Sequence, residues 1–358
     1  MKLCGYKKLS RIAFSFSQKW NALWGRPLKV QNKKGVMFLN KNLIGNTPMI
    51  KIFYEYKGVE RYVYTKLEYY NLTGSIKDRV ACRIIRKAKE DGVLKDGMPL
   101  VEATSGNTGI SISALGAYYN HPVYIFMPDW VSIERKKLME SFGANIILIS
   151  KEDGGFIAAV KKAKEFAEKN NAFLVNQFAN EENFKTHFEE TGKEILEQIN
   201  EEIGAFVSGV GTGGTLMGIG KRLKAENTNT KVMALEPDKM PILSAGKMIS
   251  QHKIEGIGDD FVPDLVDKNA IDDIILIDDV EAIKMAQKIA KSLGLGVGIS
   301  SGANLLGAVL AREKTSNAVV TVFADDNKKY LSTDLMMNLE DASKGISDEI
   351  RLLRYESV

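Results

Sequence analysis

Between residues 99 and 323 the chain alternates between short apolar runs and longer stretches in which apolar residues recur at helical spacing. This alternation constrains the fold more than any other feature, because strands that alternate with helices are typical of βαβ units with parallel strands. The apolar runs predict strands at Pro99–Glu102, Val123–Met127, Asn145–Ile149, Phe173–Val175, Ala205–Val210, Val232–Leu235 and Val319–Phe323. The helical spacing predicts helices at 75–91, 108–118, 132–142, 155–169, 184–200, 216–225 and 280–293. The sequence therefore predicts an α/β fold.

At 358 residues the chain is too long for one small core and suits two α/β domains, each a mostly parallel sheet flanked by helices. We place the boundary near Asn180, which gives an N-terminal domain at 37–180 and a C-terminal domain at 181–345. The end of the chain reads as an amphipathic helix followed by a polar tail at 346–358.

Charge is distributed unevenly along the chain. Residues 1–36 carry nine Lys or Arg residues and no acid, which indicates a targeting peptide or a dispensable basic extension. The remaining residues hold 40 of the 49 basic side chains and all 45 acidic ones, so they show no net-charge signature of nucleic-acid binding. No apolar run approaches the roughly 18 residues of a membrane span. Cys4 and Cys82 lie far apart, which suits a reducing, cytoplasmic location, and no metal site is expected.

Lys77 stands at the start of the predicted helix 75–91, in the segment Gly74–Arg79. The positive end of a helix dipole disfavours a cation there, so the amine loses its proton more easily than an ordinary lysine. A neutral amine is a nucleophile that forms a Schiff base with an aldehyde. For one lysine alone, a solvated residue at a helix start remains the simpler interpretation. Two further loops favour a chemical role for Lys77 instead.

The first loop is Thr104–Gly109 (TSGNTG), which follows a predicted strand and precedes a predicted helix. Its hydroxyl and amide side chains gather at a helix N-terminus, where free backbone N–H groups favour an anion such as a carboxylate. An N-cap turn that satisfies only its own helix is the alternative.

The second loop, Gly211–Thr215 (GTGGT), would let backbone amides and two hydroxyls surround a phosphate at the start of the next helix. Gly209, Gly211 and Gly214 also satisfy G-x-G-x-x-G, and Glu236 ends the following apolar run, as in a dinucleotide-binding fold. An NAD-dependent dehydrogenase is therefore an alternative, but it leaves Lys77 and the TSGNTG loop unexplained.

Six ordered segments resemble those of cysteine synthases and of the catalytic core of cystathionine β-synthases, over about residues 40–335. They are Lys66–Arg79, TSGNTG (104–109), Met127-Pro128 with Ser132 and Glu134-Arg135, GTGGT (211–215), Glu255–Gly258 and Gly298–Gly302. The resemblance implies a fold-type-II enzyme, similar in fold to tryptophan synthase β, that uses pyridoxal 5′-phosphate (PLP) and forms a homodimer.

The same resemblance implies roles for individual residues. Lys77 would bind PLP as a Schiff base and later shuttle the substrate's α-proton, and Asn107 would hydrogen-bond the ring oxygen. Ser300 would face the pyridine nitrogen, and a neutral partner there favours chemistry at Cβ over transamination. The phosphate would be bound by Gly211, Thr212, Gly213, Gly214 and Thr215. The substrate carboxylate would be bound by Thr104, Ser105, Asn107, Thr108, Gln177 and Gly256.

Asp259 departs from both families, in which the corresponding residue is typically alanine or tyrosine. A solvated loop acid is one interpretation. The other is a general base that activates water or deprotonates a thiol, which would convert L-cysteine and water to L-serine and hydrogen sulfide. The stretches 177–183 and 324–330 also depart from the family pattern, so the resemblance does not determine the shape of the pocket.

Together these features predict β-replacement or β-elimination on L-cysteine or a β-substituted L-serine through an aminoacrylate, with hydrogen sulfide incorporated or released. An eliminating deaminase that gives pyruvate and a cystathionine β-synthase-type enzyme that forms a thioether are alternatives within the same chemistry. Outside it, the alternatives are an NAD-dependent dehydrogenase and a cofactor-binding pseudoenzyme.

Overall fold

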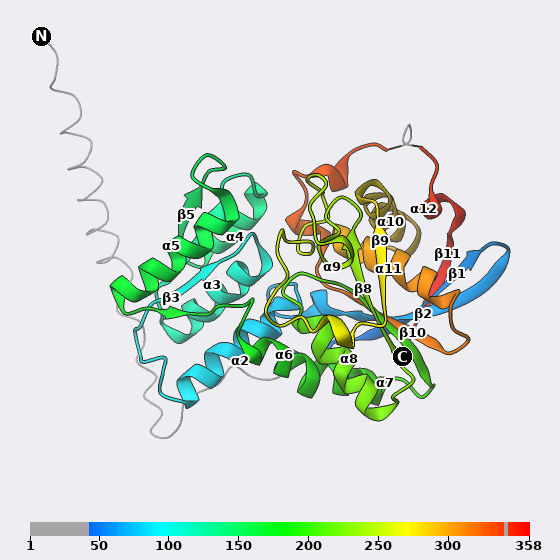
Figure 1. Ribbon diagram of the computed structural model, residues 1–358, viewed down its shortest axis with the longest axis horizontal. Coiled ribbons are helices and arrows are strands. Elements are labelled where there is room, and N and C mark those ends of the chain that lie inside the picture. Colours follow the sequence, from blue (N-terminus) through cyan, green and yellow to red (C-terminus); the bar gives the residue numbers. More distant parts are fainter. Residues whose placement is uncertain (1–42, 340–342) are drawn as a thin grey trace, which may run out of the picture. The chain divides into compact units, whose positions relative to one another are not determined.

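The structure is a computed structural model that describes residues 43–339 and 343–358 (Figure 1). The predicted basic extension at 1–36 and Cys4 therefore lie outside the described residues. Two sheets organise the described part of the chain, one of seven strands and one of four. We call the residues built around them the large lobe and the small lobe.

The large sheet has five parallel strands and an antiparallel edge. In spatial order its strands are β11 (Arg351–Ser357), β1 (Met49–Tyr56), β2 (Val59–Leu67), β10 (Ala318–Phe323), β7 (Ile203–Gly209), β8 (Lys231–Pro237) and β9 (Asp273–Ile277). Strands β11, β1 and β2 pair antiparallel, and the pairs from β2 to β9 are parallel. The small sheet is entirely parallel, with the order β5 (Asn145–Ile149), β4 (Val123–Pro128), β3 (Leu100–Ala103) and β6 (Phe173–Leu174). The predicted α/β fold with mostly parallel sheets is confirmed.

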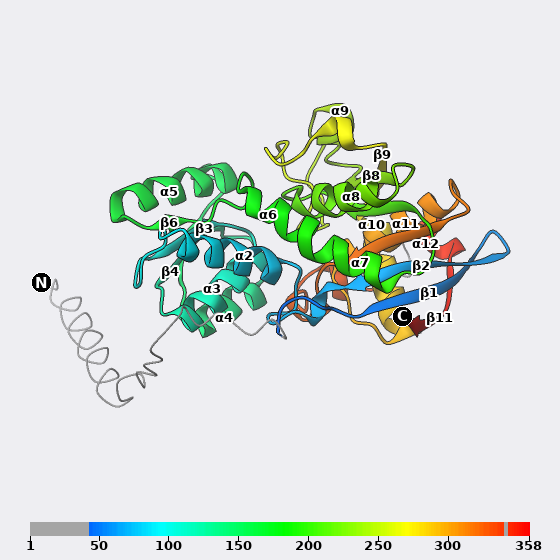
Figure 2. The same ribbon diagram turned by 90° about the horizontal axis from the view of Figure 1, so that it is seen from below.

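Helices cover both faces of each sheet, as βαβ units require (Figure 2). In the small lobe, α5 (Gly155–Asn170) lies on one face, and the other carries α2 (Lys77–Glu90), α3 (Asn107–Tyr119) and α4 (Ile133–Ser141). In the large lobe, α10 (Asp279–Leu293) and α11 (Ile299–Arg312) cover one face, and α6 (Glu181–Thr186), α7 (Gly192–Gln198) and α8 (Gly214–Glu226) the other. Two short helices, α9 (Ile242–Ala245) and α12 (Ile346–Glu349), complete the lobe.

Strand β7 shows how one strand serves two cores. Ala205 and Val207 belong to the apolar cluster under α10 and α11, whereas Phe206 belongs to the cluster under α7 and α8. Successive side chains of a strand point to opposite faces, so a strand covered on both sides must be apolar at every position. This is why the central strands read as unbroken apolar runs.

The two sheets do not follow the predicted division at residue 180, because β1 and β2 belong to the large sheet. The end of the chain also differs from its prediction, since most of it forms strand β11 rather than a helix and tail. Most of its side chains are exposed because it lies at the sheet edge, so its sequence carries little apolar signal. Residues 184–200 form α6, a π-helical turn at His187–Thr191 and α7 instead of one helix.

Helix α11 and strand β9 are absent from the predicted elements. Nearly every residue of α11 is buried, including the polar Ser300, Ser301 and Asn304, which interrupt the apolar pattern at core positions. No helix within the described residues is long and apolar enough to cross a membrane.

Candidate active site

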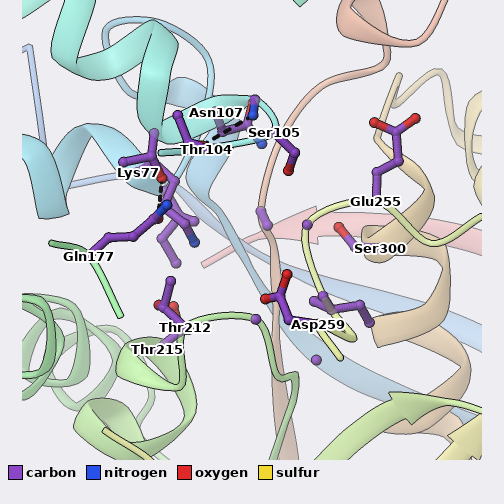
Figure 3. Close-up of a pocket in the computed structure, with 18 of the residues that line it drawn as sticks. Lys77, Thr104, Ser105, Asn107, Gln177, Thr212, Thr215, Glu255, Asp259 and Ser300 are labelled. Carbon is purple, nitrogen blue, oxygen red and sulfur yellow. Dashed lines mark hydrogen bonds between the residues drawn. The ribbon is translucent and has the colours of Figure 1, made fainter. Parts of the chain in front are cut away.

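A cleft between the two lobes brings together residues that lie far apart in the sequence, such as Lys77 and Ser300, which are 223 positions apart (Figure 3). It encloses about 950 Å³, part of which is open to solvent. Its walls come from loops at the carboxyl ends of β3, β7 and β10, which is where α/β sheets generally bind ligands. The predicted site residues that line it are Lys77, Thr104, Ser105, Asn107, Thr108, Gln177, Gly211, Thr212, Gly213, Thr215, Gly256, Asp259 and Ser300.

Gly214 is the exception among the predicted residues, because it does not line the cleft. It is the first residue of α8, and a Cβ there would lie 2.1 Å from Asn183 Oδ1. Gly214 therefore allows α8 to lie against Asn183.

Lys77 is the first residue of α2, and its side chain reaches deep into the cleft, where part of its surface remains accessible. Burial lowers the pKa of Lys77, while the carboxylates of Asp325 and Asp259 partly oppose this effect. The amine has no hydrogen-bond or ion-pair partner among residues 43–339 and 343–358. Burial thus acts in the direction that the sequence analysis expected, toward easier loss of the proton.

The helix that carries Lys77 is fixed to the large lobe by a buried ion network. Arg79 Nε donates to Glu68 Oε2 at 2.6 Å, and Arg79 Nη1 donates to Glu194 Oε1 at 2.6 Å. Upstream, the Ile76 N–H donates to the Ala324 carbonyl at 2.9 Å. Lys77 therefore lies where α2, which packs in the small lobe, is anchored to the large one.

The TSGNTG loop joins β3 to the N-terminus of α3. The Thr104 hydroxyl accepts from the Gly106 N–H at 3.2 Å, and the Thr108 hydroxyl donates to Gln177 Oε1 at 2.6 Å. Ser105 is exposed, so its hydroxyl is available to a ligand. Because the first N–H groups of α3 have no partner within the helix, this end of the cleft suits a carboxylate.

Glu102 supports this loop from below, and the sequence analysis did not identify it. Its two carboxyl oxygens accept from the Ala103 N–H at 2.9 Å and from the Gln177 N–H at 3.2 Å. Burial raises the pKa of Glu102 to about 8. Glu102 thereby joins the end of β3 to the segment that carries Gln177.

The glycine loop forms the opposite end of the cleft, at the N-terminus of α8. Gly213 has a φ of +84°, a conformation that glycine adopts without strain. The Thr212 hydroxyl accepts from Asn183 Nδ2 at 2.8 Å, and the Thr215 hydroxyl lies 3.2 Å from His187 Nε2. Burial lowers the pKa of His187 well below its usual value, so this ring is neutral. Asn183 and His187 therefore orient the two hydroxyls, and no spacing in the sequence pointed to them.

Gly211 is expected to be essential for the shape of this loop, since a Cβ there would lie 2.4 Å from the Gly256 carbonyl oxygen. Both groups are backbone, so Gly211→Ala must displace one of the two segments. Strain of this kind costs about 1–3 kcal/mol, and we expect about a 5- to 150-fold weaker affinity for PLP. Titration of the apoprotein with PLP measures it, with Glu226→Ala at the exposed end of α8 as control. Unchanged affinity in Gly211→Ala would show that the loop does not contact the cofactor.

Asp259 lies in the cleft wall directly after Gly258, whose N–H donates to the Val210 carbonyl at 2.9 Å (Figure 3). Burial and, to a lesser extent, the neighbouring Asp260 raise the pKa of Asp259 to about 6, although Lys77 acts in the opposite direction. Ser300, the second residue of α11, lines the same cleft and is buried. The cleft thus holds an amine and a carboxyl group whose pKa values are shifted toward neutrality from opposite sides.

Glu236 does not serve a dinucleotide. Its carboxylate is buried and accepts from the backbone N–H of Leu243 at 2.8 Å and of Ser244 at 3.0 Å. It therefore satisfies the first turn of α9, and the predicted ribose-binding acid of the NAD alternative is wrong. Within the described residues no group of three or more His, Cys, Asp or Glu side chains is arranged to hold a metal ion.

At the mouth of the cleft the two lobes touch through charged and aromatic side chains. Arg135 of the small lobe forms an ion pair with Glu255 of the large lobe, and its guanidinium lies 4.7 Å from the centre of the Tyr330 ring. The rings of Phe178 and Phe261 are 5.1 Å apart. Arg135 and Glu255 occur in the motifs quoted above, but their pairing required the folded chain.

Comparison with known proteins agrees with this geometry. A cysteine synthase from Staphylococcus aureus is 40% identical over 299 residues, which cover 82% of this chain and 95% of that protein. A cysteine synthase B from Campylobacter jejuni is 40% identical over 295 residues, 82% of this chain and 96% of the relative. The crystal structure of a hydrogen sulfide-producing enzyme from Fusobacterium nucleatum is 51% identical with a TM-score of 0.85, and covers 89% of this chain and 98% of its own.

A second structure of a hydrogen sulfide-producing enzyme, a variant with asparagine in place of one aspartate, is complexed with an α-aminoacrylate intermediate. It is also 51% identical, with a TM-score of 0.85, and covers 87% of this chain and 96% of its own. Residues 41–325 match the model of one protein family, described as pyridoxal-phosphate dependent enzyme. Since that match covers most of the sequence, the chain belongs to the pyridoxal-phosphate dependent enzymes.

Proposed function

We propose that this enzyme replaces or eliminates the β substituent of L-cysteine or of a β-substituted L-serine, with hydrogen sulfide released or taken up. The observation that carries the proposal is the presence of Lys77 and Asp259 in one cleft, with pKa values moved in opposite directions. Such pairs of titratable groups are typical of sites that transfer protons. The substrate class is supported by relatives named cysteine synthase and hydrogen sulfide-producing enzyme.

The residues present fit PLP. An aldehyde requires a free amine, and Lys77 has one without a competing partner among the described residues. A phosphate requires donors at the far end of the cleft, where Thr212, Thr215 and the N-terminus of α8 lie. Asn107 adds a buried side-chain oxygen, Oδ1, that has no partner in the part of the chain described. We infer that Lys77, Asn107, Ser300 and the 211–215 loop hold the cofactor.

When bound, PLP supplies the means to spread the charge left by removal of the α-proton, so that a group on Cβ can depart and another can be added. Lys77 is the residue positioned to move that proton, because its Nζ is the one lysine amine among residues 43–339 and 343–358 that lines the cleft. A lowered pKa keeps part of the Lys77 population neutral, as a base must be.

The substrate carboxylate is best accommodated at the TSGNTG loop. The N-terminus of α3 offers backbone N–H groups, and Thr104, Ser105 and Gln177 surround it. Gln177 is held by the Thr108 hydroxyl, which fixes the direction of its amide. A carboxylate fixed there and a phosphate bound at Gly211–Thr215 would fix the two ends of the reacting system, which leaves Cα and Cβ between them near Lys77.

Asp259 determines which nucleophile the cleft favours. With a pKa of about 6 it is mostly ionised at neutral pH, so it repels an anion such as hydrosulfide. The same carboxylate accepts a proton from a neutral nucleophile, either water or a thiol. We infer that water attack, which converts L-cysteine and water to L-serine and hydrogen sulfide, is the reaction that this cleft favours.

Product identification from L-cysteine tests the proposal. We expect equal amounts of L-serine and hydrogen sulfide, and a thioether in addition when a second thiol is present. Pyruvate and ammonia in place of serine would identify an eliminating deaminase, and a thioether without serine would identify a cystathionine β-synthase-type enzyme. A protein that binds PLP but leaves every amino acid unchanged would be a pseudoenzyme. Assembly as a homodimer in the cytoplasm remains an expectation from the family resemblance.

A further inference from the structure

Asp325 is a fully buried aspartate in direct contact with a residue of the cleft, and none of the roles above uses it. It follows β10, and its Oδ2 accepts from Asn107 Nδ2 at 2.8 Å and from the Tyr330 hydroxyl at 2.7 Å. Both partners donate, so Oδ2 accepts twice, while Oδ1 is buried and has no hydrogen-bond partner among the described residues. Its backbone forms an isolated bridge with Ser75, two residues before Lys77. Asp325 therefore contacts both the lysine segment and Asn107.

The contact with Asp325 determines which end of the Asn107 amide faces which neighbour. The two ends of an amide side chain are almost identical in shape, so only hydrogen bonding distinguishes them. A carboxylate accepts and cannot donate, which directs Nδ2 of Asn107 toward Asp325 and leaves Oδ1 buried without a partner among the described residues. A neutral side chain at 325 that both donates and accepts would remove this constraint.

The same carboxylate is one of the charges nearest the Lys77 amine. The titratable groups that face Lys77 are Asp325, Asp259 and the neutral ring of His187. Of the two carboxylates, Asp325 has the larger effect in raising the pKa of Lys77 against the effect of burial. Loss of its charge should therefore make the lysine nitrogen lose its proton at lower pH.

We propose that Asp325 is a positioning residue for the cofactor site, where its carboxylate fixes the Asn107 amide and retains the proton on the Lys77 nitrogen. The Tyr330 hydroxyl donates to that carboxylate and holds it in place. The Tyr330 ring also packs against the guanidinium of Arg135 from the small lobe. The turn 324–330 departs from the family pattern, and this inference gives that turn a function in the cofactor site. This inference rests on the proposed attachment of PLP at Lys77.

The test is a pH titration of the visible absorption band of the holoenzyme, which reports the proton on the Lys77 nitrogen. In Asp325→Asn the midpoint is expected to fall by about 1 pH unit or more, because an opposite charge close to the amine is lost. The matched control is Asp326→Asn, which removes a charge from the adjacent residue. Asp326 pairs with Lys329 at 3.6 Å and caps the Lys328 N–H, and it does not line the cleft. Its variant should keep the wild-type midpoint.

Each outcome of this titration either supports or overturns the role of Asp325. An unchanged midpoint in Asp325→Asn overturns the inference, and so does an equal shift in Asp326→Asn, which would indicate a general effect of charge. If Asp325→Asn does not fold, Asp325→Ser, which is smaller and also uncharged, replaces it with the same expected shift. Absence of a visible band from the wild-type protein would instead refute the proposed attachment of the cofactor at Lys77.

Discussion

Replacing Lys77 with alanine is expected to abolish hydrogen sulfide release from L-cysteine and to remove the covalently held visible band of the cofactor. The described part of the chain places no other lysine amine in the cleft, so none of its lysines replaces Nζ as the group that binds the aldehyde or takes the α-proton. Loss of proton transfer alone lowers kcat by about 10²–10⁴-fold. The side chain makes no hydrogen bond among the described residues, so the fold should be retained.

The measurements are steady-state sulfide release, the visible spectrum after denaturation and the circular dichroism of the same samples. Lys328→Ala is a suitable control, because Lys328 is largely exposed and does not line the cleft. If Lys77→Ala kept a cofactor that survives denaturation, another residue would be the attachment point and the assignment of Lys77 would be wrong.

Replacing Asp259 with asparagine is expected to lower L-serine formation from L-cysteine by about 10²–10⁴-fold, because asparagine has the same shape but cannot take a proton from water. The pH dependence gives a second signature. Asp259 is raised to a pKa of about 6 and acts in its ionised form, so wild-type activity should decrease as the pH falls through about 6. That limb of the profile should be absent from the residual activity of the variant.

Asp260→Asn is the matched control, since Asp260 is the exposed neighbour and does not line the cleft. Its loss should lower the pKa of Asp259 and move the acid limb to lower pH without a large change in rate. Serine yield and sulfide release that stay unchanged in Asp259→Asn would exclude the carboxylate as the base.

The sequence predicted the residues of the site more completely than it predicted the elements of the fold. Thirteen of the predicted site residues line one cleft, and most of them lie in loops or in the first turn of a helix. Loops at the carboxyl ends of parallel strands meet at one edge of the sheet, so local sequence patterns were enough to predict which residues line the cleft. The sequence could not show that Gly214 also packs against Asn183, since glycine serves equally for ligand approach and for close packing.

Sequence reasoning did not predict which side chains pair with one another in the folded chain. Arg135 meets Glu255, Asn107 meets Asp325, and the Thr215 hydroxyl meets the ring of His187. None of these pairs has a characteristic spacing, because the partners come from different lobes or from different elements. The extent of β1 and the strand β11 were missed for the same reason, since their pairing joins residues some 300 positions apart.

The pairing of the first strands with the last ones has a consequence for how the enzyme is made. Strands β1 and β2 are synthesised well before their neighbours β11 and β10, which lie far later in the sequence. Contacts of such long sequence separation are slow to form. The segment Gly74–Lys77 follows β2 and the short 3₁₀ helix Glu68–Tyr70, so the reactive amine reaches its final place only after β10 and β11 have been made. Partly synthesised chains should therefore lack a formed cofactor site.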